Sequence, residues 1–284
     1  MTARPSQATT LGLTALAMLA FAANSILCRL ALGAGAIDAA SFGTIRVVSG
    51  AAVLALIVAR RTGAHPAALG DWRSALMLFA YVALFSFAYL SLDAGTGALI
   101  LFGAVQLTMF AVALSRGERF GPVAWAGLAM AIGGLVYLVS PGLTAPPPGA
   151  ALLMAGAGVA WGAYSLLGRG VPDPLGATGG NFLRAVPMVL VVSAVFAGDF
   201  HATTAGVGLA VASGAVTSGI GYVIWYAALK GLTASSAATV QLSVPAIAAF
   251  GGVMLLDEAL TLRLVVASAA TLGGIAIVLT RRRT

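Results

Sequence analysis

Charged residues are scarce in this sequence, and their scarcity decides the class of protein. Asp, Glu, Lys and Arg make up 8% of the 284 residues, whereas soluble domains carry about 25%. Hydrophobic residues make up 60%, and the mean hydropathy is +1.02. So few charges could not cover the surface of a fold of this size in water. The composition therefore excludes a soluble globular protein and predicts an all-α integral membrane protein whose surroundings are the lipid bilayer.

Cysteine, histidine and catalytic motifs are equally scarce. Cys28 is the single cysteine, so an internal disulfide is excluded, and its apolar surroundings predict a packing role. His65 and His201 fall in loops predicted on opposite sides, and the sequence has no H-E-x-x-H, no paired intramembrane aspartates and no G-x-x-x-x-G-K-[ST]. We therefore expect no enzyme, no metal site and no cofactor. The net charge of +7 does not predict nucleic-acid binding, because the basic residues stand singly or in short clusters between apolar runs.

Long apolar segments are abundant instead. A helix needs roughly 20 apolar residues to cross a hydrocarbon core of about 30 Å. The first segment runs for about 20 residues from Leu11 with no basic cluster before it, which predicts a retained helix rather than a cleaved signal. Ten spans are predicted at 10–30, 38–59, 73–92, 96–115, 121–140, 148–168, 178–197, 205–229, 234–256 and 262–280.

The distribution of basic residues predicts the orientation of these spans. Ten spans place both termini on one side, and cytoplasmic termini leave Arg29 and Arg263 as the basic residues of the outer loops. The inner loops and tails then hold Arg4, Arg60, Arg61, Arg73, Arg116, Arg119, Arg169, Lys230, Arg281, Arg282 and Arg283. Because cytoplasmic loops are enriched in Lys and Arg, we predict that both termini are cytoplasmic.

The sequence also contains two copies of one pattern. FAANSILCR at 21–29 returns as WGAYSLLGR at 161–169, and three further blocks repeat in the same order at offsets of 137 to 140 residues. These blocks are TIRVVSG with NFLRAVP, YLSLDAGT with YAALKGLT, and GERFGPVAWAGLAMAIGGLVYL with DEALTLRLVVASAATLGGIAIVL. Five spans per copy is an odd number, so the second copy enters the membrane from the opposite side. We predict two inverted five-helix repeats at 1–140 and 150–284, joined by a Pro-rich loop at 141–149.

These motifs resemble a known family of transporters. They comprise an Arg near the start of the second helix of each half, Y-x-x-L-x-x-x-T, Pro245 thirteen residues before Glu258, and Gly-Gly in the last helix. The combination resembles the drug/metabolite transporter superfamily with two EamA-type repeats, and within it the YddG-type aromatic amino-acid exporters of bacterial inner membranes. The resemblance implies a ten-helix inner-membrane exporter. The first half departs from the pattern because it has Thr108 where the second has Pro245, so the fourth helix is expected to be straighter than the ninth.

Polar and aromatic residues inside the spans predict the transport pathway, because a lipid-facing helix surface requires neither. We expect aromatic walls that stack an apolar ring, and amide and hydroxyl groups that orient a polar head. The alternative is that such residues pack helices together or anchor them at the interface, and the anchor role is preferred for Tyr137. The predicted cavity residues are Asn24, Tyr81, Phe85, Tyr89, Gln106, Trp161, Tyr164, Ser165, Tyr222, Trp225, Tyr226, Gln241 and Ser243.

Structural or gating roles are predicted for a second group of residues: Arg46, Arg184, Glu118, Glu258, Pro187 and Pro245. Each arginine could bind a carboxylate. A framework role is favoured, because both stand about two turns from the start of a span, within snorkelling reach of the interface. The two glutamates are expected to cap the last helix of each half, and the two prolines to bend their helices.

The mechanism and the substrate are predicted from the same charged, polar and aromatic residues. No Asp or Glu falls near the middle of a predicted span, although ion-coupled carriers need such a carboxylate. We therefore predict downhill export of a neutral or aromatic amino acid, or of a related small metabolite, by alternating access. Purines, sugars, cysteine derivatives and cationic compounds are alternative substrates, and a channel is the rival mechanism. Both a monomer and a homodimer fit the sequence.

Overall fold

The computed structural model describes residues 6–62 and 69–280. The predictions made for Arg4, His65, Arg281, Arg282 and Arg283 lie outside these residues. The described chain is helical: α1 (Gln7–Gly33), α2 (Ala39–Thr62), α3 (Trp72–Ala88), α4 (Ala94–Ser115), α5 (Pro122–Val139), α6 (Pro148–Leu167), α7 (Pro174–Val195), η2 (Ala197–Asp199), α8 (Thr204–Val211), η3 (Ala212–Ile220), α9 (Gly221–Leu229), α10 (Ala234–Val240), α11 (Ser243–Leu256) and α12 (Leu262–Thr280).

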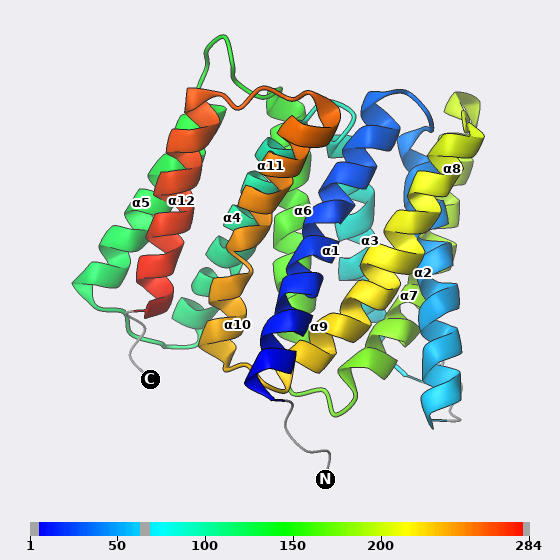
Figure 1. Cartoon of the computed structure of the whole chain (residues 1–284), viewed down its shortest axis with the longest axis horizontal. Helices are drawn as coiled ribbons and strands as arrows, with labels where there is room; N and C mark the ends of the chain where they lie inside the picture. Colours follow the sequence, from blue (N-terminus) through cyan, green and yellow to red (C-terminus); the bar gives the residue numbers. More distant parts are fainter. Residues whose placement is uncertain (1–5, 63–68, 281–284) are drawn as a thin grey trace.

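These helices run from one face of the molecule to the other (Figure 1). Within the described residues, nine stretches are long and apolar enough to span a membrane, and the shorter apolar helix Trp72–Ala88 makes the remaining crossing. The predicted all-α membrane fold is therefore confirmed. We call the face at which α1 begins and α12 ends the proximal face, and the face with the connections 34–38, 89–93, 140–147, 196–203 and 257–261 the distal face.

The eighth and ninth crossings are not single α-helices. The eighth passes from α8 through a π-helical stretch, η3, into α9. The ninth is broken into α10 and α11 at Gln241 and Leu242. Pro245 explains this break, because it has no backbone N–H to donate to the carbonyl of Gln241 four residues earlier. By contrast, α4 is continuous, as the absence of proline there predicts, and α7 continues through Pro187.

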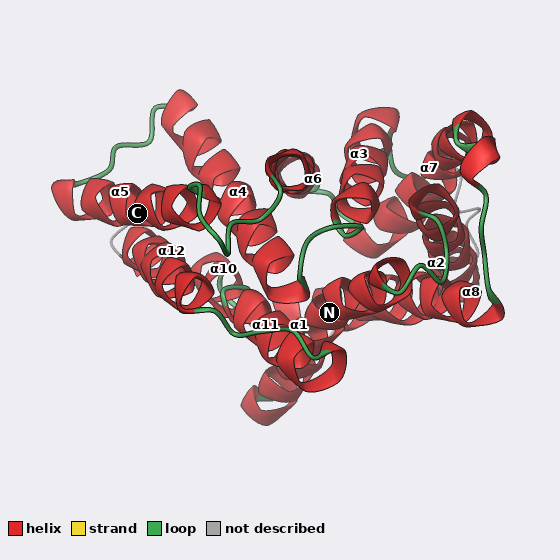
Figure 2. Cartoon of the chain, turned by 90° about the horizontal axis from the view of Figure 1, so that it is seen from above, coloured by secondary structure: helices red, strands yellow, loops and turns green. Residues whose placement is uncertain are grey.

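The ten crossings form an elongated bundle when seen end-on (Figure 2). The pair α5 and α12 lies at one end, and α2, α7 and α8 lie at the other. Between them, α1 packs against α9 and α11, whereas α6 packs against α3 and α4. The first helix of the chain thus packs on later helices, and α6 packs on earlier ones.

Candidate functional site

A cavity of about 1140 Å³ lies between α4, α6, α7, α9, α10 and α12. It is lined at the proximal face by Arg119, Arg169 and Thr280, and it reaches inward to Trp161 and Tyr222. Eight of the residues predicted from the sequence line it: Gln106, Trp161, Tyr164, Ser165, Tyr222, Trp225, Tyr226 and Gln241. Its volume slightly exceeds the range of about 300–1,000 Å³ of typical ligand pockets. A small organic molecule therefore fits, with room for water.

Aromatic rings form the inner end of this cavity. Trp161 stacks on Tyr164 at 5.3 Å between ring centroids and on Tyr222 at 5.7 Å. Tyr81 lies behind Trp161, with 4.9 Å between the centroids. The interplanar angles of 24° and 22° present nearly parallel faces, onto which a further flat ring can stack. We call Tyr81, Trp161 and Tyr222 the aromatic layer.

Hydroxyl groups hold two of the wall rings in place. Tyr164 donates its phenol hydrogen to Thr178 Oγ1 at 3.1 Å, and the hydroxyls of Thr178 and Tyr226 share a hydrogen bond of 2.8 Å. Thr178 and Asn181, both on α7, line the cavity and were missed by the sequence analysis. The amide of Asn181 accepts a hydrogen bond from the backbone of Asp71 at 2.9 Å. A buried Asn in an apolar span was the signal that could have identified this position.

Charged residues of both signs surround the mouth of the cavity: Asp71, Glu118, Arg119 and Arg169. Asp71 caps α3 by accepting a hydrogen bond from the Ser74 backbone at 2.9 Å. Burial acts to raise the pKa of Asp71, but the hydrogen bonds from Ser74 and Arg73 outweigh it and lower the pKa. With two acids and two bases, the mouth does not favour one sign of charge.

A second, much smaller chamber of about 20 Å³ lies beyond the aromatic layer. That volume holds about one water molecule. Trp161 and Tyr222 line both spaces, so they separate the chamber from the cavity. Three other predicted site residues, Asn24, Tyr81 and Phe85, line the chamber and do not line the cavity.

Two predicted cavity residues lie outside both spaces. Tyr89 is fully buried toward the distal end of the bundle and donates its hydroxyl hydrogen to the Ala94 carbonyl at 3.2 Å. Ser243 is exposed, and its hydroxyl donates to the Val240 carbonyl at 2.7 Å. The break before α11 turns Ser243 away from Gln241, which lines the cavity.

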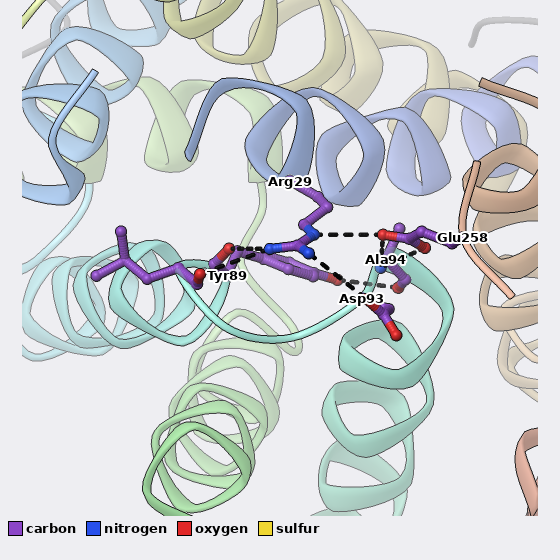
Figure 3. Close-up of polar contacts among 6 residues, drawn as sticks. Arg29, Tyr89, Asp93, Ala94 and Glu258 are labelled. Carbon is purple, nitrogen blue, oxygen red and sulfur yellow. Dashed lines mark hydrogen bonds and ion pairs between the residues drawn. The ribbon is translucent and has the colours of Figure 1, made fainter. Parts of the chain in front are cut away.

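A cluster of polar contacts links α1 to two loops at the distal face (Figure 3). Arg29 on α1 pairs with Glu258 at 3.3 Å and with Asp93 at 3.5 Å. The two carboxylate oxygens of Glu258 accept hydrogen bonds from the backbone N–H of Ala94, with N···O distances of 3.0 and 2.9 Å. Burial raises the pKa of Glu258 above its ordinary value, outweighing the Ala94 N–H and Arg29, which lower it. We call Arg29, Asp93 and Glu258 the distal cluster.

The predicted capping role of Glu258 was wrong as to the helix. Glu258 caps the start of α4 rather than α12, whose first turn is capped by the Thr261 hydroxyl accepting from Leu264 N at 3.1 Å. The N-cap of α5 is Gly121, three residues after Glu118. The loop before α12 has the predicted bounds, 257–261, but the Glu258 side chain turns to Ala94 at the start of α4.

The two arginines occupy unlike environments. The Arg46 side chain does not snorkel as predicted, because the residue is 1% exposed and points into the bundle. Arg184 donates to the backbone carbonyls of Leu69 and Gly180, near the proximal end of α7. The shared position of the two residues in their repeats predicted one role for both, but the neighbouring helices give them different partners.

Comparisons with known proteins agree with this architecture. The model of the EamA-like transporter family matches residues 148–280. The uncharacterized protein PA1977 of Pseudomonas aeruginosa is 54% identical over 273 residues, which cover 96% of this chain and 95% of that protein. A solved protein crystal structure aligns with a TM-score of 0.69 at 20% identity, over 98% of this chain and 100% of the other, a likeness that shows the fold alone. Residues 148–280 therefore form an EamA-like transporter domain, which makes the chain a multi-pass membrane transporter of the drug/metabolite type.

Proposed function

We propose that this transporter exports aromatic and other neutral amino acids, with related small metabolites, across the bacterial inner membrane. The observation that carries the proposal is the ring-lined end of the proximal cavity, where Trp161 stacks between Tyr164 and Tyr222. Flat apolar faces of this kind select a ligand that carries an apolar ring. The hydroxyl of Thr178 and the amides of Gln106 and Gln241 line the same cavity and can orient its polar end.

Alternating access is supported by the unequal state of the two faces. The cavity is lined by residues of the proximal face, whereas the distal cluster ties α1 to the loops before α4 and α12. Release on the distal side requires the distal cluster and the aromatic layer to part while the proximal cavity closes. In a protein built from inverted repeats, rocking of one repeat against the other exposes the central site first to one face and then to the other. The packing of α1 on α9 and α11, mirrored by that of α6 on α3 and α4, supports the assignment of 1–140 and 150–284 as these repeats.

The orientation follows from the charges of the two faces. The described proximal residues include Arg60, Arg61, Arg73, Arg116, Arg119, Arg169 and Lys230, against Arg29 and Arg263 at the distal face. The positive-inside rule therefore assigns the proximal face and both termini to the cytoplasm. In this orientation the cavity is open to the cytoplasm, where an exporter takes up its substrate.

Downhill movement is supported by the positions of the acidic residues. All eight lie within the described chain, in loops or at helix ends: Asp38, Asp71, Asp93, Glu118, Asp173, Asp199, Asp257 and Glu258. A proton or sodium site in the middle of the membrane normally requires a carboxylate there. An imposed pH gradient should therefore fail to drive uphill uptake into vesicles.

The test is the flux of labelled phenylalanine, tryptophan, leucine and alanine into proteoliposomes that contain the purified protein. We expect saturable flux that prefers the two aromatic substrates. Trp161→Ala should lower aromatic flux at least tenfold, since stacking and apolar burial of a ring contribute about 1.5 kcal/mol or more. Trp125→Ala is the matched control, because Trp125 lies on α5, 47% exposed and outside the cavity lining.

Two outcomes would contradict the proposal. Flux that does not saturate would indicate a pore rather than a carrier. If the protein is folded but moves no amino acid, the substrate of the cavity must belong to another class of metabolite, such as purines, sugars, cysteine derivatives or cationic compounds.

A further inference from the structure

Arg46 carries a positive charge into the middle of the bundle. Its Nη2 donates to the Tyr81 hydroxyl at 3.0 Å, and its Nε donates to Ser218 Oγ at 3.3 Å. The guanidinium carbon lies 5.2 Å from the centroid of the Tyr81 ring and 4.9 Å from that of Phe85. With 1% exposure, Arg46 has no contact with bulk water.

This charge has no acidic partner in the described chain. The ion pairs there join Arg29 to Asp93 and Glu258, and Arg61 to Asp173. Arg46 Nη1 is buried and has no hydrogen-bond partner among the described residues. A buried cation without a counter-ion is energetically costly in a membrane protein. The Nη1 donor of Arg46 is therefore available to an acceptor on a bound molecule.

The surrounding polar groups fix the guanidinium in place. Asn24 Oδ1 accepts hydrogen bonds from Ser213 at 2.8 Å and Thr217 at 2.6 Å, and Asn24 Nδ2 donates to Ser218 at 3.5 Å. Ser213 and Ser218 stand five residues apart in η3, one turn of a π-helix, so both face α1. On another side, η3 approaches α2 closely at Gly214, where a Cβ atom would collide with the Arg46 carbonyl.

The guanidinium lies directly behind the aromatic layer. Tyr81 contacts Arg46 on one side and Trp161 on the other, and Trp161 forms the end of the cavity. Tyr81 and Phe85, the two rings that cover the guanidinium, also line the small chamber. The guanidinium therefore lies against the wall of the chamber, covered by these two rings.

We propose that Arg46 binds the carboxylate of the transported molecule while its ring stacks on the aromatic layer. This inference rests on the proposed function and names its substrate class more narrowly, as aromatic monocarboxylates. Arg can pair with a carboxylate through two N–H groups. Nη1 of Arg46 has no hydrogen-bond partner among the described residues, so it can donate to such a carboxylate. Neither the aromatic layer nor the chamber presents an Asp or Glu as a counter-ion for an ammonium group. The amino group of an amino acid is therefore dispensable, whereas its carboxylate is required.

The experiment measures the flux of labelled phenylalanine into proteoliposomes in the presence of unlabelled competitors. The competitors are phenylalanine, 3-phenylpropanoate, phenylalaninamide and 2-phenylethylamine. In the wild type we expect the two carboxylates to compete alike, and the amide and the amine to compete at least tenfold more weakly. In Arg46→Gln the carboxylates should lose this advantage, in Arg46→Lys they should keep part of it, and in Arg184→Gln they should keep all of it.

The outcomes separate the inference from the proposed function. Phenylalanine flux that the amide inhibits as well as 3-phenylpropanoate does would overturn the role of Arg46 and leave amino-acid export standing. If phenylalanine does not move, the proposed function fails, and the thermal shift of the detergent-solubilised protein with the same four compounds tests Arg46 by itself. There, carboxylates should stabilise the wild type and Arg184→Gln but not Arg46→Gln. Equal stabilisation by the amine, or none by either carboxylate, would overturn the inference even if Arg46→Gln failed to fold.

Discussion

At the scale of single residues, Glu258 shows how one carboxylate can connect segments that are distant in the sequence. Its side chain is 9% exposed and contacts Arg29 on α1 and the backbone of Ala94 at the start of α4. It therefore neutralises a cation and caps a helix at the same time. Because it binds both partners at the distal face, its loss should favour opening of that face.

We predict that Glu258→Ala increases access to the space beneath the distal cluster. Cys28 is adjacent to Arg29 and fully buried, and as the single cysteine it reports this access by its rate of alkylation with a small maleimide. Loss of a hydrogen bond to a charged group costs roughly 1.5–3 kcal/mol, which corresponds to a rate increase of about tenfold or more. Asp199→Ala, an exposed acid on the same face, should leave the rate unchanged. Equal labelling of the two variants would show that the distal cluster does not control access.

A second carboxylate, Asp71, predicts a dependence of stability on pH. Its pKa is lowered in the folded protein, so its contribution is fully present above the ordinary carboxylate pKa and is lost as the pH falls through the lowered value. Asn caps a helix about as well as Asp but does not titrate. The unfolding temperature of the wild type should therefore exceed that of Asp71→Asn at neutral pH, and the difference should shrink as the pH is lowered toward 3. A difference that stays constant with pH would contradict the assigned role of Asp71.

At the scale of elements, close helix packing depends on which of two adjacent glycines faces a neighbour. A Cβ atom at Gly134 on α5 would lie 2.5 Å from Thr271 Oγ1 and 2.8 Å from Thr271 N on α12. A Cβ atom at Gly133 would meet no atom within 4 Å. Small residues at such a contact let helix backbones approach in a membrane, where apolar burial gives no driving force between helices.

This contrast predicts opposite effects of two adjacent substitutions. Gly134→Ala should destabilise the protein by about 1–3 kcal/mol through overpacking against α12. Gly133→Ala should stabilise it by up to about 1 kcal/mol, because Ala is the better helix former. Thermal unfolding of both variants in the same detergent measures the difference. The packing argument fails if the two shifts have the same sign and size.

The irregular elements lie where the structure places its buried polar groups. The π-helical turn η3 supplies Ser213, Thr217 and Ser218 to the group around Asn24. The break between α10 and α11 leaves Gln241 at the cavity and turns Ser243 outward. Helices that depart from regular hydrogen bonding at buried polar sites are a known feature of functional regions.

At the scale of the whole molecule, the cavity opens on one face and ion pairs close the other, so orientation in the membrane decides which state this is. Basic residues of the described chain concentrate at the proximal face, which predicts that the cavity faces the cytoplasm. A transporter in this state can bind a substrate from the cytoplasm. The opposite orientation would make the same cavity an outward-open one.

Labelling of intact cells checks the orientation. In a Cys28→Ser background, Leu143→Cys lies in the distal connection 140–147 and Lys230→Cys at the proximal end of α9. A membrane-impermeant maleimide should label Leu143→Cys in intact cells and Lys230→Cys only after the cells are lysed. The reverse pattern would invert the orientation and, with it, the direction in which the cavity is open.

The sequence by itself determined the membrane class, the ten crossings and the aromatic rings at the inner end of the cavity. These features follow from local properties: apolar runs of sufficient length, and rings or amides inside them that have no reason to face lipid. Even the break in the ninth crossing was predictable, because the cause, Pro245, is local. Eight predicted residues line the cavity for the same reason.

Only the tertiary structure decided which polar groups meet. The partner of Glu258 is the start of α4 rather than of α12, and Arg46 enters the bundle without a counter-ion whereas Arg184 turns to the proximal end. Equivalent positions in a repeated sequence carry the same local signal, but each side chain pairs with helices that are remote in the chain. Long-range packing sets those distances, and periodicity and composition do not encode them.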